Sequence, residues 1–324
     1  MQMTPQFNDA PSITVVIAAF NAVASLERAV ASALAQSMSV EVIIVDDAST
    51  DNTLEIADAL MLADPRVRLL SSAVNGGPSV ARNKGIVAAR GEWVAILDAD
   101  DAFAPDRLRK LSAIGARHDA DLVADNLIVY DWAAQAVAGY ALPRSKNLIQ
   151  HIRSVDFVRN AVTGQSRFDF GQLKPIFRRR FLMARCLRYP PELRHGEDFA
   201  FILDCLLADG RFVLTTEALY LFTQRFGSIS GQISGQSRTS MNLHAMRDHT
   251  LGLLDHPRVR GDRIMTALLV KRAKAIRYQL SWNKAYPHLR ARKPLALLSA
   301  LMADWSNWPM LVRHLVRRQQ NRYT

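Results

Sequence analysis

The sequence is poor in cysteine and has no long apolar run. Its 324 residues include two cysteines, Cys186 and Cys205. Because two thiols cannot build a disulfide framework or a thiolate zinc site, we expect a reducing compartment. Nowhere do 18 consecutive apolar residues occur, which argues against a membrane-spanning helix. Residues 1–12 carry neither a basic residue nor the apolar core of a secretion signal. These absences predict a cytoplasmic protein.

Two common phosphate-binding signatures are missing as well. The sequence has no GxxxxGK[ST] loop and no GxGxxG fingerprint, so it predicts neither a P-loop protein nor a dinucleotide-binding protein. It also contains no internal repeat and no low-complexity tract.

Positive charge is confined to the C-terminal quarter of the chain. The formal net charge is +11. Residues 245–324 hold 16 Lys or Arg against four Asp, whereas the other 244 residues hold 25 basic and 26 acidic residues. A strongly basic protein suggests nucleic acid or an anionic surface as its partner, and here that property belongs to a terminal segment.

Four continuous apolar runs alternate with helical patterns in the first hundred residues. Runs of this kind are typical of parallel strands that are buried on both faces. The expected strands are residues 13–20, 40–45, 67–70 and 93–97, and the expected helices are residues 25–36, 52–62 and 78–90. This alternation predicts an α/β fold with a Rossmann-like, mostly parallel sheet flanked by helices. Beyond residue 110 the pattern weakens, with strands expected at 121–130, 173–177 and 211–215 and a helix at 199–208.

Polar residues follow each of the four expected strands. In parallel α/β sheets, ligands bind beyond the carboxyl ends of the strands. The residues at these ends are Asn21, Asp46, Asp47, Asn75, Gly76, Asp98, Asp100 and Asp101. The last three carboxylates repel one another unless a cation or strong hydrogen bonding compensates, and a cation here would be Mg²⁺ or Mn²⁺. The alternative is that one of these aspartates caps the helix that Pro105 begins.

Three further segments each have two interpretations. The turn at residues 75–78 leads into a helix N-terminus that suits an anion, although a single Gly-Gly pair is a weak signal. Glu197 and Asp198 could supply a general base, or they could simply favour the first turn of a helix. A cation and two hydroxyls near residue 228 could meet a phosphate or form a polar loop; these residues are Arg225, Ser228 and Ser230.

Together these segments resemble the motifs of family 2 inverting glycosyltransferases, which have the GT-A fold. The motifs are residues 17–21, 45–51, 75–85 and 97–101, and they occur in that family's order and spacing. The resemblance is strong over residues 12–110, moderate to about residue 230 and weak beyond. In segments 174–181 and 196–198 the chain is similar to bacterial exopolysaccharide glycosyltransferases of the succinoglycan type.

The resemblance implies a domain organisation. Residues 1–240 would form the GT-A catalytic domain, with a nucleotide-binding half at 12–110 and an acceptor-side half at 111–240. Residues 241–324 would form a helical, basic C-terminal segment.

The resemblance also implies roles for single residues. Asp98 and Asp100 match the motif that holds the ribose and a divalent metal, Mn²⁺ or Mg²⁺, with Asp100 the direct ligand. Glu197 and Asp198 match the acidic pair near the acceptor, with Asp198 the base. Ala18, Phe20 and Asp47 match positions that contact the nucleotide base. The full set expected to bind the nucleotide sugar is Ala18, Phe20, Asn21, Asp46, Asp47, Asn75, Gly77, Arg82, Asn83, Asp98 and Asp100. The candidates for the diphosphate or the acceptor are Asp101, Arg225, Ser228 and Ser230.

The activity implied is the inverting, metal-dependent transfer of one sugar, with UDP-glucose as the expected donor. The acceptor would be an oligosaccharide linked to polyprenyl diphosphate, in the biosynthesis of an exopolysaccharide or another surface polysaccharide. The Gln-x-x-Arg-Trp motif of processive enzymes is missing, because the similar segment reads Gln224-Arg225-Phe226. The alternatives are a nucleotidyltransferase acting on sugar phosphates, a nucleic-acid-binding protein that uses the basic segment, and this fold without activity.

Residues 294–316 combine leucine and tryptophan with basic residues at both ends. Such a segment suits a helix that lies in the interface of an anionic membrane. It also suits a helix packed on the rest of the protein, since Pro309 interrupts the pattern. The sequence therefore leaves open a peripheral location on the inner face of the cell membrane.

Overall fold

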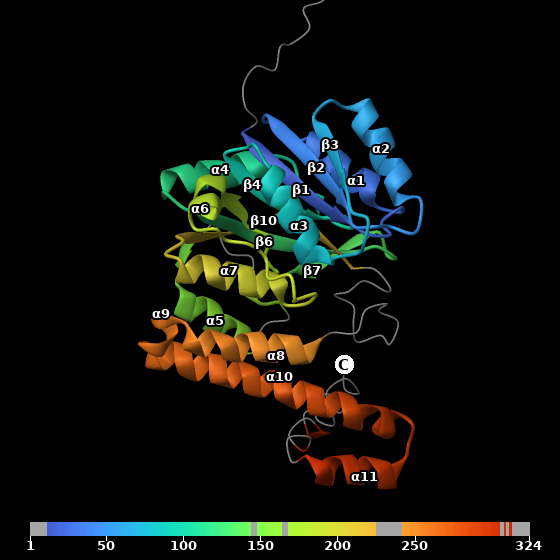
Figure 1. Ribbon diagram of the computed structural model, residues 1–324, viewed down its shortest axis with the longest axis vertical. Coiled ribbons are helices and arrows are strands. Elements are labelled where there is room, and N and C mark those ends of the chain that lie inside the picture. The colour runs from blue at the N-terminus through green and yellow to red at the C-terminus, as the bar shows by residue number, and fades with distance from the viewer. Residues whose placement is uncertain are drawn as a thin grey trace, which may run out of the picture. The chain divides into compact units, whose positions relative to one another are not determined.

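The computed structural model describes residues 12–143, 148–163, 168–224 and 242–304, together with residues 308, 311 and 312. The chain divides into two compact units, Met1–Ser240 and Met241–Thr324. The first unit holds all the described strands, and the described part of the second unit consists of helices and their connections (Figure 1).

The first unit is built on one sheet of ten described strands. Their order is β3-β2-β1-β4-β9-β6-β10-β5, with β7 paired to β6 and β8 paired to β10. The strands are β1 (Ile13–Ala19), β2 (Val40–Asp46), β3 (Val67–Ser71), β4 (Trp93–Asp98), β5 (Ala102–Phe103), β6 (Leu122–Asp131), β7 (Ala136–Tyr140), β8 (Ile149–Ile152), β9 (Ile176–Arg178) and β10 (Phe212–Gln224). The four strands expected in the first hundred residues are confirmed.

Six of these strands run in the same direction. β1 is parallel to β2 and β4, and β2 is parallel to β3. β9 is antiparallel to both of its neighbours, β4 and β6, so β6 runs parallel to β4, and β10 runs parallel to β6. The carboxyl ends of β1, β2, β3, β4, β6 and β10 therefore meet at one edge of the sheet, and the chain order reverses between β1 and β4.

Helices cover both faces of the parallel part of the sheet. The helices of the first unit are α1 (Leu26–Leu34), α2 (Thr53–Ala63), α3 (Pro78–Ala88), α4 (Arg107–Arg117), α5 (Ser154–Thr163), α6 (Arg179–Ala184) and α7 (Glu197–Leu207), with a 3₁₀ turn η1 (Phe170–Gln172). Right-handed crossovers place α1 and α2 on one face and α3 on the other, and α3 crosses the near face in Figure 1. At Gly85 an added Cβ would lie 2.2 Å from Val16 Cγ1, so α3 approaches β1 as closely as glycine allows.

A buried ion pair connects α4 to the middle of the sheet. Arg107 and Asp125 have fully buried side chains, with 2.7 Å between Arg107 Nη2 and Asp125 Oδ1. The same Arg107 nitrogen donates a hydrogen bond to the carbonyl oxygen of Lys174. Asp125 Oδ2 also accepts a hydrogen bond from the backbone N–H of Leu219. These contacts fix the backbone just before β9 relative to α4, β6 and β10.

The second unit is an assembly of helices with no described strand. Its elements are α8 (Leu243–Gly252), a 3₁₀ turn η3 (Leu253–Asp255), α9 (Pro257–Arg260), α10 (Arg263–Arg290) and α11 (Pro294–Ala303). Asp262 caps the long helix α10, because its Oδ1 accepts hydrogen bonds from the backbone N–H groups of Ile264 and Met265. Both α8 and α11 pack against α10. Within the described part of the chain, no helix is long and apolar enough to cross a membrane.

Candidate functional site

The strand ends expected to carry chemistry lie together at the carboxyl edge of the sheet. The pairing register places Ala18 of β1 opposite Asp98 of β4 on one side and Val45 of β2 on the other. This is the point where the strand order reverses, which is where open α/β sheets form their ligand crevice. Phe20, just past the end of β1, exposes 49% of its surface.

Asn21 and Asp46 hold the loops that follow β1 and β2. Asn21 adopts a left-handed backbone conformation, with φ of 51°, and its Oδ1 accepts a hydrogen bond from Thr50 N at 2.8 Å. Both carboxylate oxygens of Asp46 accept hydrogen bonds from Ser49, one from its backbone N–H and one from its hydroxyl. These two polar side chains therefore shape the crevice wall.

Asp47 joins the loop after β2 to the loop after β3. Its Oδ1 accepts a hydrogen bond from Gly76 N at 3.0 Å, and its Oδ2 accepts one from Gly77 N at 2.7 Å. Asn75 Nδ2 donates to the carbonyl oxygen of Asp47. Gly77 has φ of +86°, a conformation that favours glycine, and the side chain of Arg194 lies directly over it.

Five charged side chains meet beyond β4, and they form the centre of the site. Arg82 of α3 and Lys174, two residues before β9, are the cations. Asp98 at the end of β4 and Glu197 and Asp198 in the first turn of α7 are the anions. Arg82 lies 2.7 Å from Asp98, 2.8 Å from Glu197 and 3.2 Å from Asp198. Lys174 Nζ lies 2.8 Å from Asp98 Oδ2 and 2.7 Å from Asp198 Oδ2.

Opposite charges in this cluster stabilise the ionised forms of Asp98 and Lys174. Burial alone would raise the pKa of Asp98, but the charges of Lys174 and Arg82 hold it well below its usual range. Burial alone would lower the pKa of Lys174, but Asp198 and Asp98 raise it above that of a free lysine. Burial and the charge of Asp198 raise the pKa of Glu197. Asp98 is thus ionised and Lys174 protonated at neutral pH.

Asp101 has a different environment from Asp98 and Asp100. It is 1% exposed, and its Oδ2 and Oδ1 accept hydrogen bonds of 2.7 Å from Tyr220 Oη and Thr223 N. The Tyr220 hydroxyl also accepts a hydrogen bond from Asp98 N, and β5 pairs with β10 at Tyr220 and Leu221. Burial, Asp100 and Asp98 raise the pKa of Asp101. Asp101 fastens the loop to β10, so we do not place it against a diphosphate or an acceptor.

Asp100 is the side chain in this loop that best suits a divalent metal. It is partly exposed, and its backbone carbonyl accepts a hydrogen bond from Arg28, whose guanidinium lies over the Trp132 ring. Among the described residues, no three His, Cys, Asp or Glu side chains gather as a metal site. Mg²⁺ often uses one or two protein carboxylates together with substrate phosphates. The carboxylates present fit a metal of this kind, which a donor diphosphate would help to hold.

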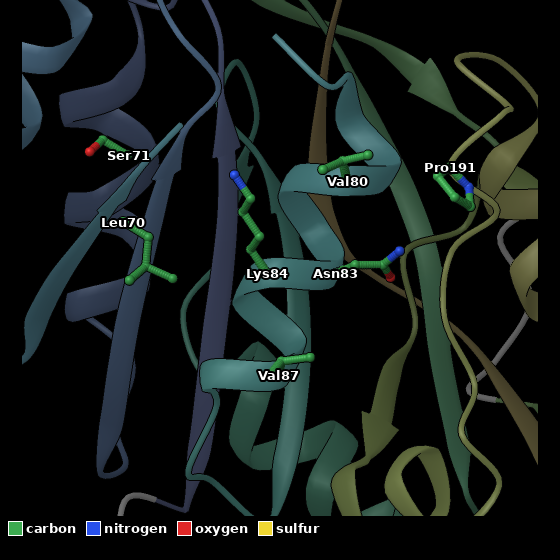
Figure 2. A pocket seen from close by; sticks show the side chains of 7 residues that line it. All are labelled: Leu70, Ser71, Val80, Asn83, Lys84, Val87 and Pro191. Atoms are coloured by element: carbon green, nitrogen blue, oxygen red, sulfur yellow. The ribbon is translucent and has the colours of Figure 1, made fainter. Parts of the chain in front are cut away.

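The remaining predicted residues fall outside this cluster. Asn83 exchanges two hydrogen bonds of 2.8 Å with the backbone of Tyr189. It also lines a pocket of about 630 Å³ on the outer side of α3. Figure 2 shows Leu70 and Ser71 on one side of α3 and Pro191 on the other. None of the five charged residues lines this mainly apolar pocket, so the pocket is separate from the charged cluster. Arg225, Ser228 and Ser230 lie outside the described residues.

Sequence reasoning gave no role to two residues of the site, Lys174 and Tyr220. The signal for Lys174 was a lysine inside an otherwise apolar segment, 173–177, since a lysine is seldom buried without a partner. Tyr220 had no such signal, because a tyrosine in a buried strand is common.

Residues 14–179 match the family model described as Glycosyl transferase family 2. The chain belongs to this family. Over 227 residues it is 40% identical to Succinoglycan biosynthesis protein ExoO of Rhizobium meliloti (strain 1021), a match that covers 70% of this chain and 64% of that protein. It is 35% identical to Succinoglycan biosynthesis protein ExoU of the same strain, covering 68% and 64%. The match thus spans less than two thirds of the length of these two relatives.

Solved structures with the same fold include enzymes crystallised with sugar nucleotides. TarS of S. aureus in complex with UDP-GlcNAc has a TM-score of 0.65 at 21% identity, covering 90% of this chain and 79% of that one. The mannosyltransferase PcManGT of Pyrobaculum calidifontis, in complex with GDP-Man and Mn²⁺, has a TM-score of 0.58 at 18% identity, covering 98% and 82%. The expected family and the GT-A-type α/β fold are confirmed.

Proposed function

We propose that this family 2 protein is an inverting glycosyltransferase that moves one sugar from a UDP-sugar to an oligosaccharide acceptor. The observation that carries this proposal is the placement of Asp98 and Asp198. They come from a strand end and a helix start 100 residues apart in the sequence, yet the same two cations hold both. Asp198 would supply the base that a direct displacement needs on the acceptor side, and Asp98 would help to hold the donor on the other side.

The donor would bind along the edge formed by the ends of β1, β2 and β4. The exposed ring of Phe20 and the backbone at Ala18 offer the nucleotide base a surface. Asp98 and Asp100 lie on the β4 side, where the ribose and the diphosphate would follow. A divalent metal, Mn²⁺ or Mg²⁺, held by Asp100 beside Asp98 would offset negative charge on the diphosphate. UDP-glucose is the first donor to test.

Asp198 would act as the general base. Its carboxylate accepts the proton of the attacking hydroxyl while that oxygen forms a bond to the anomeric carbon. The bond from the anomeric carbon to the diphosphate oxygen breaks, and the electron pair leaves with the diphosphate. Because attack and departure lie on opposite sides of the carbon, the configuration inverts. Arg82 and Lys174 orient Asp198 through one oxygen each.

An exopolysaccharide acceptor is supported by the relatives named for succinoglycan biosynthesis. We extend this proposal to an acceptor linked to polyprenyl diphosphate, used at the inner face of the cell membrane. The family match favours glycosyl transfer over nucleotidyl transfer, and the acidic strand ends have a role here that nucleic-acid binding would leave unexplained.

The second unit offers a surface that suits such a membrane. Residues 242–304 carry 12 Lys or Arg and four Asp. Three large apolar side chains of α11, Leu295, Leu298 and Met302, expose 82%, 51% and 60% of their surface. Their spacing places them on one face of the helix, and Leu301, beside that face, is buried. Arginines and a lysine at positions 290, 292 and 293 precede this face and are exposed, a combination that favours anionic lipid.

A screen of sugar nucleotides with release of the nucleoside diphosphate as the readout tests the proposed reaction. We expect UDP release from UDP-glucose, increased by a bacterial lipid extract as the source of acceptor. Asp198→Asn should lower kcat by at least ~10²-fold, the usual scale of general-base catalysis, and should keep UDP binding. The matched control is Asp58→Asn on α2, an exposed carboxylate outside the site. Unchanged turnover in Asp198→Asn would remove Asp198 from the mechanism.

A further inference from the structure

The donor-side and acceptor-side carboxylates are joined twice. Arg82 bridges Asp98 Oδ1 and Asp198 Oδ1 at 2.7 and 3.2 Å. Lys174 bridges Asp98 Oδ2 and Asp198 Oδ2 at 2.8 and 2.7 Å. The four side chains form a closed ring in which each carboxylate gives one oxygen to each cation. This arrangement fixes both the separation and the relative rotation of the two carboxylates.

The two kinds of charge differ in their exposure to solvent. The side chains of Arg82 and Lys174 are 6% and 7% exposed, whereas those of Asp98 and Asp198 are 25% and 18% exposed. The cations therefore lie behind the carboxylates, which face the side that a ligand can reach. Removing one cation would leave three acidic side chains, including Glu197, against a single positive charge, and repulsion would then separate them.

The backbone of Lys174 is held by a buried ion pair. Its carbonyl oxygen accepts a hydrogen bond from Arg107 Nη2, and Arg107 is itself held by a fully buried ion pair with Asp125. Two residues later, Ile176 pairs with Ala95 of β4 and Val123 of β6. The ammonium group therefore extends from an anchored backbone position and lies between the two carboxylates that it contacts.

We propose that Lys174 is a positioning residue, which holds the acceptor-side carboxylate of Asp198 at a set distance from the donor-side carboxylate of Asp98. This inference rests on the proposed role of Asp198 as the base. Lys174 acts through Asp198 and does not need to touch either sugar. Arg82 cannot replace it, because each Asp198 oxygen has a separate partner, and without Lys174 the carboxylate can rotate about its remaining contact.

The test is a set of variants measured with two probes. Lys174→Met, Lys174→Arg, Asp198→Asn and the double variant Lys174→Met/Asp198→Asn are compared for UDP release from UDP-glucose with a bacterial lipid extract, and for UDP binding by calorimetry with Mn²⁺. Lys84→Met is the matched control, since Lys84 lies on the same helix as Arg82 but is exposed and donates to Ser72 Oγ. Thermal melting confirms that each variant is folded.

Lys174→Met is expected to lose about 10²-fold in kcat, the scale of a misplacement of about 1 Å, and to keep UDP binding, because Arg82 still holds Asp98. Lys174→Arg, which keeps the charge, should be faster than Lys174→Met. In the Asp198→Asn background the same Lys174→Met change should cost far less than 10²-fold, because residues that act as one unit are not additive. If Lys174→Met melts below the assay temperature, Lys174→Arg takes its place in this cycle.

Three results would overturn the inference: unchanged kcat in Lys174→Met, an equal loss in both backgrounds, or a loss of UDP binding that matches the loss of turnover. The failure of the proposed function is distinguishable, because it requires Asp198→Asn to keep its turnover.

Discussion

Asp204 on α7 offers a test of the electrostatics of the first unit that needs no substrate. Burial, followed by the charge of Glu192, raises the pKa of Asp204 from 3.8 to about 6. At a pH between these two pKa values, Asp204 has lost its proton in the unfolded chain and keeps it in the folded chain. The free energy of unfolding therefore falls as pH rises from about 4 to about 6, and it levels off above that range.

The size of the effect follows from the two pKa values. A difference of about two pKa units corresponds to ~3 kcal/mol of destabilisation once Asp204 is ionised in both states. Asp204→Asn keeps the size of the side chain and removes the ionisation. Relative to the wild type, we expect the variant to gain ~1.5 kcal/mol at pH 5 and ~3 kcal/mol at pH 8.

Urea unfolding followed by tryptophan fluorescence measures these gains, since Trp93 is buried in β4. Asp58→Asn on α2 is the control, because its side chain is exposed. A gain for Asp204→Asn that is the same at both pH values would refute the reasoning. A loss of stability at pH 8 would show instead that the carboxylate makes a contact worth more than its burial costs.

Three further predictions concern the site and the second unit. Asp100→Ala should abolish the Mn²⁺-dependent part of UDP binding, as measured by calorimetry with and without Mn²⁺. If Mn²⁺ strengthens UDP binding equally in the wild type and the variant, the metal site assigned to Asp100 is wrong. Tyr220→Phe removes a hydrogen bond to the buried Asp101 and should lower the free energy of unfolding by ~2 kcal/mol; an unchanged urea midpoint would contradict the role given to Tyr220. The triple change of Leu295, Leu298 and Met302 to Ser should abolish flotation with phosphatidylglycerol vesicles, and flotation equal to that of the full wild-type chain would defeat the lipid-facing assignment of α11.

The strands of the parallel sheet could be predicted because they are buried on both faces. A run such as Ile13–Ala19 contains no alternation of polar and apolar residues, and helices on either side remove the need for one. The end of β10 could not be predicted in this way. The sequence indicated a strand at 211–215, whereas the structure extends it to Gln224 with two register irregularities, which depend on pairing with residues about 90 positions earlier.

The acidic strand end shows the same limit at the level of single residues. Asp98 is the last residue of β4, and Asp100 and Asp101 follow it within three positions, so the sequence alone does not separate their roles. The structure separates them because β5 pairs with β10 and carries Asp101 beneath the surface against Tyr220. Motif spacing predicted the location of the candidate site, and long-range pairing buries one of its three carboxylates against β10.

The position of β9 also has a consequence for how the first unit is made. This strand enters the sheet between β4 and β6 although it follows both in the sequence. A nascent chain that ends before residue 176 would leave two neighbouring strand edges without their shared partner, and such edges invite aggregation. We therefore expect the sheet to be completed only after β9 and then β10 have been synthesised, with Lys174 entering the site together with β9.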